Sequence, residues 1–569
     1  MDCKLTTTSV RQEHRLRSLH RWQQKQLLPF SGWLHGNKAR YYKPLDPCIN
    51  TGDTTWVLVS SILVLSMMPA LAFFEAGLLR SINTVSLVTQ IMSGTAVLAA
   101  LWHIIGYSLV FGDTVGGFIG NLKNVAMIGV EYNTCSQHAP NIPAALYGFF
   151  QMMFASITPL LLTGAFAERM RFKCYFAFII LWEILIYYPV AHWIWGTGWM
   201  STMNPPVQDF AGGIVIHTTA GAAALVCALV LGQRKGFDQY DGEFPPSNLP
   251  LAALGGALLW TSWFGFNAGS ALTSGSLAVS TVVATQRAAV ISGLIWLAIS
   301  WIRGKPSAVA TINGIIAGLA GITPASGFVD PQMATVIGVL LGFSSYGGVY
   351  LLKHILRIDD ALDVSSVHGI PGIVGALCIG FFGQKKFNPD GADGIFFGDH
   401  SARLLGVQAL AIVVSGLWAA FFTWAILKVL DLIMGLRLRD EELGLDVKDH
   451  GETAYGWQHY HQQQHEVLLN VDGQVLDTNE TTRVLVAAAS SVLSLSRSQS
   501  RENLLSSYGT MNERRSRQPS VIGLDLPSSV LPYLTNFLLF YVYSLAWIIH
   551  DVSASFDRRH EARAGQSED

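Results

Sequence analysis

The chain alternates long apolar runs with short polar connections through most of its length. Apolar stretches of about 20 residues are long enough to cross a bilayer as α-helices. Eleven such stretches follow one another, at 54–79, 85–111, 143–166, 173–195, 210–232, 250–270, 277–302, 308–323, 332–352, 364–383 and 404–434. We therefore predict an all-α polytopic membrane protein, with a membrane domain of eleven transmembrane helices over 51–434.

Polar segments flank this domain. Residues 1–50 contain no apolar run and are predicted to be an N-terminal extension, not a secretory signal. Residues 435–457 form a charged segment after the last helix and are predicted to be a cytoplasmic regulatory segment that docks by charge on a neighbouring subunit. The Ser-rich 458–525 is predicted to be disordered. Residues 526–549 are uncharged and predict either a twelfth membrane helix or an interfacial one, followed by a polar C-terminus at 550–569.

The basic residues of the loops predict the orientation. Loops after the odd-numbered helices carry Arg80, Arg169, Arg171, Lys173, Arg234, Lys235, Arg303, Lys305, Lys353 and Arg357, whereas the other loops carry only Lys123, Lys385, Lys386 and Arg403. Because positive loops favour the cytoplasm, the start of helix 1 is predicted outside and the end of helix 11 inside. The basic residues within 1–50 run against this rule.

Composition narrows the class of protein. Half of the residues are apolar, 13% are charged and the mean hydropathy is +0.36, which is typical of a membrane protein. No basic field suited to nucleic acid is present. The six cysteines are scattered without metal-binding spacing. Cys48 and Cys135 are both predicted outside, where they form either a disulfide or two free thiols.

Two histidines interrupt the apolar runs at matching places. His217 and His368 each precede a small-residue turn that ends in glycine, at Gly221 and Gly372. Ionisable residues in a bilayer are costly and tend to face a bundle interior or a transport path. Counting 1.5 Å per residue from the helix ends places both histidines near mid-membrane. The alternative is that each histidine merely bonds a neighbouring helix.

The same two positions predict internal symmetry. If helices 1–5 and 6–10 are repeats, the fifth helix of each half carries the histidine. An odd number of helices per repeat makes the two halves inverted, with a site between them near the midplane. The expected architecture is therefore two inverted five-helix repeats plus helix 11.

Aromatic and oxygen-bearing residues gather at the predicted outer ends of several helices. This group consists of Phe154, Trp195, Asp209, Trp263, Phe266 and Ser270. Aromatic faces beside an oxygen acceptor suit a small cation. The alternatives are also open: a terminal tryptophan is often an interfacial anchor, a phenylalanine pair is often packing, and Asp209 is well placed to cap the next helix.

These residues lie in blocks that resemble the ammonium transporter family over roughly 54–457. The blocks are Gly164-Ala-Phe-Ala-Glu-Arg169, Ala191-His-Trp-Ile-Trp-Gly196, Asp209-Phe-Ala-Gly-Gly-Ile-Val-Ile-His217, Trp263-Phe-Gly-Phe-Asn-Ala-Gly-Ser270, Asp359-Asp360 through His368, and Gly444 through Tyr455. The resemblance implies a homotrimer with one pore per subunit and no cofactor.

The resemblance also implies roles for the candidate residues. Phe154, Trp195 and Ser270 would bind ammonium at the outer mouth, with Asp209 shaping it. Phe154 and Phe266 would form a gate, and Trp263 would support the lining of the pore. His217 and His368 would be the twin histidines of the pore.

This family assignment predicts transport of ammonium or ammonia, with methylammonium as an analogue, across the plasma membrane. The long Ser-rich tail alone predicts that the cell is eukaryotic. An ammonium sensor on the same fold is the alternative. A membrane enzyme is disfavoured because no metal or haem motif accompanies the histidines.

Arg287 departs from the family pattern, and the tail carries candidate regulatory positions. Arg287 lies inside helix 7, with Glu75 or a lipid headgroup as its candidate partner. The tail places Thr453, Ser516 and Ser520 where a kinase could act, and a phosphate there could dock or release a charged segment. The alternative is that these serines belong to a solvated linker.

Overall fold

The computed structural model describes residues 46–398, 402–438 and 444–455. Most of the predicted N-terminal extension, Ser516, Ser520 and the segment 526–549 lie outside the described residues.

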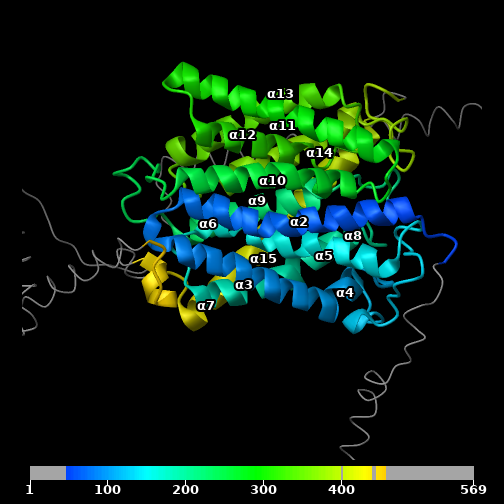
Figure 1. The fold of residues 1–569 in the computed structure, drawn as a ribbon, viewed down its shortest axis with the longest axis horizontal. Helices are drawn as coiled ribbons and strands as arrows, with labels where there is room; N and C mark the ends of the chain where they lie inside the picture. Colours follow the sequence, from blue (N-terminus) through cyan, green and yellow to red (C-terminus); the bar gives the residue numbers. More distant parts are fainter. Residues whose placement is uncertain (1–45, 399–401, 439–443, 456–569) are drawn as a thin grey trace, which may run out of the picture.

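Helices running side by side along a common direction make up the described part of the chain (Figure 1). Their bounds are α2 (Thr51–Leu78), η2 (Ser81–Asn83), α3 (Thr84–Leu101), η3 (Trp102–Gly106), α4 (Tyr107–Phe111), η4 (Val125–Met127), α5 (Ala144–Leu160), α6 (Thr163–Phe166), α7 (Phe172–Trp182), η5 (Glu183–Tyr187), α8 (Tyr188–Ile194), η6 (Gly213–Thr218), α9 (Thr219–Leu231), α10 (Leu249–Gly269), α11 (Ser276–Arg303), α12 (Ala308–Ile322), α13 (Met333–Val349), η7 (Tyr350–Ile355), η8 (Ser365–Gly369), α14 (Ile370–Phe382), α15 (Arg403–Met434) and η9 (Asp446–His450). Two antiparallel strands of two residues each, β1 (Thr114–Val115) and β2 (Ile119–Gly120), form a short hairpin in the loop after α4.

The predicted all-α membrane class is confirmed. Within the described residues, ten helical segments are long and apolar enough to cross a bilayer. The predicted stretch 308–323 corresponds to α12, which has 15 residues and is shorter than the roughly 20 that a perpendicular crossing needs. Eleven crossings therefore remain a prediction.

Side-chain caps mark where several helices begin. Asn50 accepts hydrogen bonds from the backbone N–H groups of the second and third residues of α2. Asn248 and Ser307 each accept one, from the third residue of α10 and α12. Such caps satisfy backbone N–H groups that have no partner within the helix. They fix the ends of the helices, and thereby the depth of the side chains along them.

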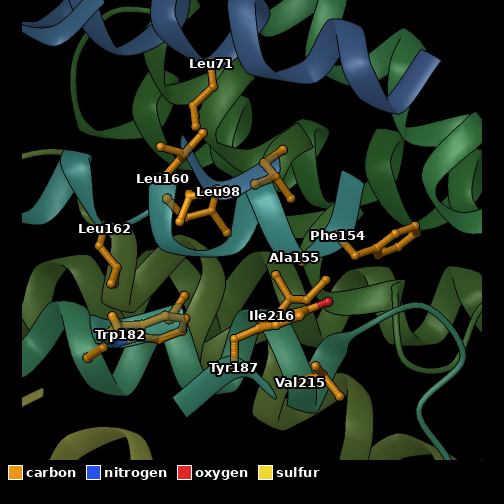
Figure 2. Packing of buried hydrophobic residues seen from close by; sticks show 14 of the residues in the cluster. Leu71, Leu98, Phe154, Ala155, Leu160, Leu162, Trp182, Tyr187, Val215 and Ile216 are labelled. Carbon is orange, nitrogen blue, oxygen red and sulfur yellow. The ribbon is translucent and has the colours of Figure 1, made fainter. Parts of the chain in front are cut away.

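The interior is packed with apolar side chains from many helices. Figure 2 draws part of it, including Leu71 of α2, Leu98 of α3 and Trp182 of α7. Glycines allow the closest crossings. A Cβ on Gly255 of α10 would lie 2.3 Å from the backbone nitrogen of Phe74, so α2 and α10 touch through their backbones.

The two ends of the described chain lie at opposite ends of the bundle. The start of α2 (deep blue) lies on the right of Figure 1, and the segment after α15 (gold) on the left. Cys48, just before α2, is disulfide-bonded to Cys135 in the loop before α5, with a Cα–Cα distance of 6.4 Å. Of the two alternatives for these cysteines, the structure contains the disulfide.

The predicted pairing of Arg287 with Glu75 is wrong. The Arg287 guanidinium reaches the carbonyl of Pro331 at 3.5 Å, in the loop that precedes α13. The Glu75 carboxyl instead accepts a hydrogen bond from Thr163 at the start of α6. Arg287 therefore bonds a nearby loop carbonyl, a partner that sequence distance does not reveal.

Candidate functional site

His217 and His368 meet inside the bundle. Their Nδ1 atoms lie 3.3 Å apart, and the two rings are nearly parallel, with centroids 5.2 Å apart. Because both Nδ1 atoms face each other, one imidazole must donate and the other accept. The Nε2 atom of His217 is buried and has no hydrogen-bond partner among the described residues, so it remains available to a passing molecule.

Each histidine sits in a π-helical turn at the start of its helix. His217 belongs to η6 and His368 to η8. An aspartate eight residues earlier caps each turn. Asp209 accepts hydrogen bonds from the backbone N–H of Gly212 and from the first three N–H groups of η6, and Asp360 accepts one from the N–H of Ser365. The matched unit is therefore Asp, His and Gly, and the sequence analysis found all of it except the cap Asp360.

Glycines at the matched positions let the two histidine helices cross. A Cβ on Gly221 would lie 2.1 Å from the Cα of Gly369, and one on Gly372 would lie 2.8 Å from the Cβ of His217. Real Cβ atoms do not approach so closely, so neither position has room for a larger residue. The close crossing brings the two imidazoles within hydrogen-bonding range.

A narrow cavity of ≈ 30 Å³ lies beside the histidine pair. A water-sized molecule fits a space of this order. Its wall is mostly apolar and is formed by Met67, Leu71, Phe74, Glu75, Ile157, Leu161, Ile216, His217, Leu259, Trp263, Phe266, Asn313, Ile316, Leu362, Val364, Val367 and His368. A bare ion is costly in such surroundings, whereas a small neutral molecule is not.

Trp263 covers both imidazoles. Its ring lies 5.7 Å from that of His217 at 23° and 6.5 Å from that of His368 at 13°. The indole N–H donates to the hydroxyl of Thr323 at 3.0 Å, which fixes the ring. The Trp263 ring thus packs nearly parallel to both imidazoles and restricts the orientation of their rings.

Two phenylalanines bound the cavity on the side of the mouth. Phe266 belongs to the cavity wall, and Phe154 lies against it with ring centroids 4.5 Å apart at 39°. Both side chains are 1% exposed. Phe150 lies one helical turn before Phe154 in α5, on the same face of the helix, and its ring packs against the Phe154 ring. The pair therefore separates the cavity from the half-buried Trp195, whose ring lies 6.0 Å from that of Phe154.

The remaining mouth residues hold one another in place. The Trp195 indole donates to the backbone carbonyl of Asp209 at 2.8 Å, and the Ser270 hydroxyl donates to the carbonyl of Phe266 at 2.8 Å. Burial raises the pKa of the Asp209 carboxyl, while its four backbone N–H bonds favour the carboxylate. Both Asp209 oxygens are occupied by these bonds, so its observed role is that of a helix cap.

An ion cluster that the sequence analysis did not find joins the loops at the opposite end of the bundle. Arg234 bonds Asp359 at 2.8 Å and Glu168 at 3.4 Å, and Glu168 also bonds Arg80 at 2.8 Å. Burial would raise the pKa of Asp359, but Arg234 and Arg169 hold it below its ordinary value. The cluster ties together loops that follow the first, third, fifth and ninth predicted helices. The orientation rule counted these arginines but could not reveal their partners.

The segment 444–455 is docked against the same end. Asp446 accepts from the N–H of Ser86 in α3 at 2.7 Å, and Asp449 from the N–H of Phe172 in α7 at 2.7 Å. Both carboxylates occupy helix N-termini, where negative charge is favoured. Thr453 belongs to this docked segment.

The fold and the site together define a polytopic membrane protein with a small, mostly apolar cavity, and a buried pair of histidines and several aromatic rings lie at its wall. The Ammonium Transporter Family model matches residues 55–455. The chain belongs to this family.

Individual relatives agree. Ammonium transporter 1 of Dictyostelium discoideum is 58% identical over 406 residues, covering 71% of this chain and 87% of that protein. Ammonium transporter Amt1 of Archaeoglobus fulgidus is 38% identical over 410 residues, covering 72% and 100%. The crystal structure of Saccharomyces cerevisiae Mep2 superposes with a TM-score of 0.65 at 33% identity, covering 71% and 93%. A structure described as a sensor Amt protein gives 0.63 at 30% identity, covering 70% and 98%.

Proposed function

We propose that this protein carries ammonium across the plasma membrane. The observation that carries the proposal is the pair His217 and His368, held 3.3 Å apart beside an apolar cavity and covered by an aromatic pair. Family membership supports transport rather than catalysis.

The chemistry explains selectivity. Moving a bare charge through hydrocarbon is very costly, and NH4+ avoids that cost by giving up its proton and crossing the cavity as NH3. Potassium has no proton to lose. The two imidazoles can donate and accept hydrogen bonds along the path, and a coupled pair can share one proton.

The outer mouth recruits the cation before it loses its proton. We assign this role to Phe154, Trp195 and Ser270, whose rings and hydroxyl offer a cation–π surface and an oxygen. Asp209 shapes the mouth as a cap, and its buried charge adds attraction. Phe154 and Phe266 act as the gate.

The membrane architecture follows the same proposal. Eleven crossings place the start of α2 outside and the end of α15 in the cytoplasm, in agreement with the opposite ends seen in Figure 1. The tight packing of α2 on α10 and of η6–α9 on η8–α14 supports two inverted repeats, because each pair joins corresponding helices of the two halves. The assembly is a homotrimer surrounded by lipid, with one pore per subunit.

Residues 435–457 form the regulatory segment. Its docking on α3 and α7 supports control of the inner end of the bundle. Thr453 is the position at which a kinase would act most directly, with Ser516 and Ser520 as further sites.

Uptake by purified protein tests the proposal. Proteoliposomes should accumulate labelled methylammonium faster than protein-free liposomes, and ammonium should compete while an equal concentration of potassium should not. Equal uptake with and without protein would contradict the transport function.

A sensor remains the second candidate, since one similar structure is described as a sensor Amt protein. The uptake measurement separates the two: a pure sensor would bind ammonium without carrying it.

A further inference from the structure

Glu75 is a titratable side chain of the cavity that the proposed transport step does not use. It lies in α2, is 3% exposed and forms part of the same cavity wall as His217 and His368. Glu75 is three residues from the end of α2, and this end is the inner one in the proposed orientation. The cavity therefore connects the histidine pair to a carboxyl group on the inner side.

One of the two oxygens of the Glu75 carboxyl accepts a hydrogen bond. The Thr163 hydroxyl donates to Oε2 at 2.6 Å, and this is the one hydrogen bond that the Glu75 carboxyl accepts within the described parts of the chain. Gly164 leaves room beside it, because a Cβ at that position would lie 3.0 Å from Oε1. One carboxyl oxygen is thus left for a proton or a passing molecule.

Among residues 46–398, 402–438 and 444–455, the groups that interact with Glu75 are acids, a hydroxyl and imidazoles, and no cation pairs with it. His217 and His368 share its cavity, while Asp360 and Tyr175 are close enough to interact with it electrostatically. The buried arginines of the inner cluster are bonded to Glu168 and Asp359 instead. Ionisable groups inside a membrane commonly serve proton relays, and a carboxyl without a fixed counter-ion can take up and release a proton.

We propose that Glu75 is the inner proton-exchange group of the conduit. A proton left by NH4+ at the mouth passes to the histidine pair, and then an imidazolium N–H bond breaks as the Glu75 O–H bond forms. At the inner end this O–H bond breaks and the proton joins the lone pair of the arriving NH3. Each cycle moves one NH4+ in net terms and returns Glu75 to its starting form.

This inference rests on the proposed transport function and predicts a change in charge movement. Glu75→Gln keeps the size of the side chain and an oxygen for Thr163, but it cannot exchange a proton. In proteoliposomes on a sensing electrode, the ammonium-evoked current should fall about tenfold or more. Neutral NH3 should still enter, so the ammonium-driven rise in internal pH should exceed that of protein-free liposomes.

Glu183→Gln is the matched control, because Glu183 is also a fully buried membrane carboxyl but is absent from the cavity wall. It should leave the ratio of current to uptake unchanged. Glu75→Asp should restore part of the current, since it keeps the proton-exchanging group. The thermal stability of each variant in detergent establishes that it is folded.

The outcomes are separable. A Glu75→Gln protein with wild-type current overturns the role of Glu75 but leaves transport intact. Equal loss of current and neutral flux in a stable Glu75→Gln protein also overturns it, because the residue would then be structural. Absence of both current and uptake in the wild type would instead refute the proposed transport function.

Discussion

At the scale of single residues, hydrogen bonds decide which groups remain free for a substrate. The Trp195 N–H is bonded to the Asp209 carbonyl, so the ring face is the part of Trp195 that can meet a cation. The Asp209 carboxylate is likewise bonded to backbone N–H groups, and it acts on a cation only through its charge. The mouth therefore offers mainly aromatic surface.

Replacing Trp195 by leucine tests this arrangement. A cation–π contact is worth about 0.5–2 kcal/mol, so half-saturation should rise roughly two- to thirtyfold while the maximal rate changes less. The measurement is the concentration dependence of ammonium-evoked current. Trp199→Leu, another half-buried tryptophan of the outer loop, is the control. If Trp195→Leu lowers only the maximal rate, Trp195 is structural or part of the gate.

Sequence reasoning located the histidines because an ionisable residue within an apolar run is a clear signal. Asp360 was missed as a cap because Asp359, Asp360 and Asp363 lie close together, and only the folded backbone reveals which of them bonds η8. The candidate pairing of Glu75 with Arg287 failed for a similar reason. The observed partner, Thr163, lies in α6, and its approach to α2 depends on helix packing.

At the scale of helices, backbone contact between the two histidine helices sets the distance between the imidazoles. The helix ranges were predictable from apolar length, but the crossing was not, because several glycines in these helices look alike in sequence. Only the folded structure reveals that a Cβ on Gly221 or Gly372 would clash with the other histidine helix. The π-helical turns were also missed, since they carry no separate hydrophobic period.

Gly221→Ala should separate the two helices. The added methyl group would overlap the backbone of Gly369, and overpacking of this kind costs about 1–3 kcal/mol. We expect a lower thermal transition in detergent and reduced flux per molecule. Gly347→Ala is the control, because a Cβ at Gly347 meets nothing within 4 Å. Equal behaviour of the two variants would mean that the crossing tolerates a side chain.

The docked tail should respond to pH through Asp446. Burial raises the pKa of its carboxyl to about 6 from the ordinary 3.8, although backbone N–H groups of α3 oppose the shift. The docked form therefore binds a proton more tightly than a released tail, so docking strengthens as pH falls from 7 towards 4. Protection of the tail from protease should rise over this window in the wild type.

Asp446→Asn should remove that dependence. Asparagine presents a neutral side chain of similar shape, so protection should no longer rise as the pH falls from 7 to 4, and the half-buried His450, whose pKa burial lowers, should make it fall slightly. Wild-type protection that decreases on acidification would contradict the assignment.

At the scale of the whole molecule, the tail joins helices that lie apart in sequence. Within one chain it bonds α3 through Asp446, α7 through Asp449 and the start of α10 through Tyr455 and Asn248. The charge pattern of 435–457 predicted docking on a neighbouring subunit at the inner end, whereas the contacts described above lie within one chain. The particular helix ends could not be predicted, because a carboxylate can cap any N-terminus that the fold brings to it.

A charge at Thr453 should act on the assembly. Thr453→Asp places a negative charge beside Asp449 and Glu452 in the docked segment, and like charges should weaken docking. We predict that trimers with one mutant and two wild-type subunits lose flux in all three pores. Flux measured on trimers of defined composition provides the test. A loss limited to a third would mean that each tail acts on its own pore.

The central claim is that His217 and His368 carry the proton step and exclude other cations. The most direct measurement compares ammonium and potassium flux in proteoliposomes for the wild type and for the double variant His217→Ala with His368→Ala, after confirming that both assemble equally. The double variant should either lose ammonium flux or admit potassium together with ammonium. Wild-type ammonium flux with wild-type exclusion of potassium in the double variant would contradict the account.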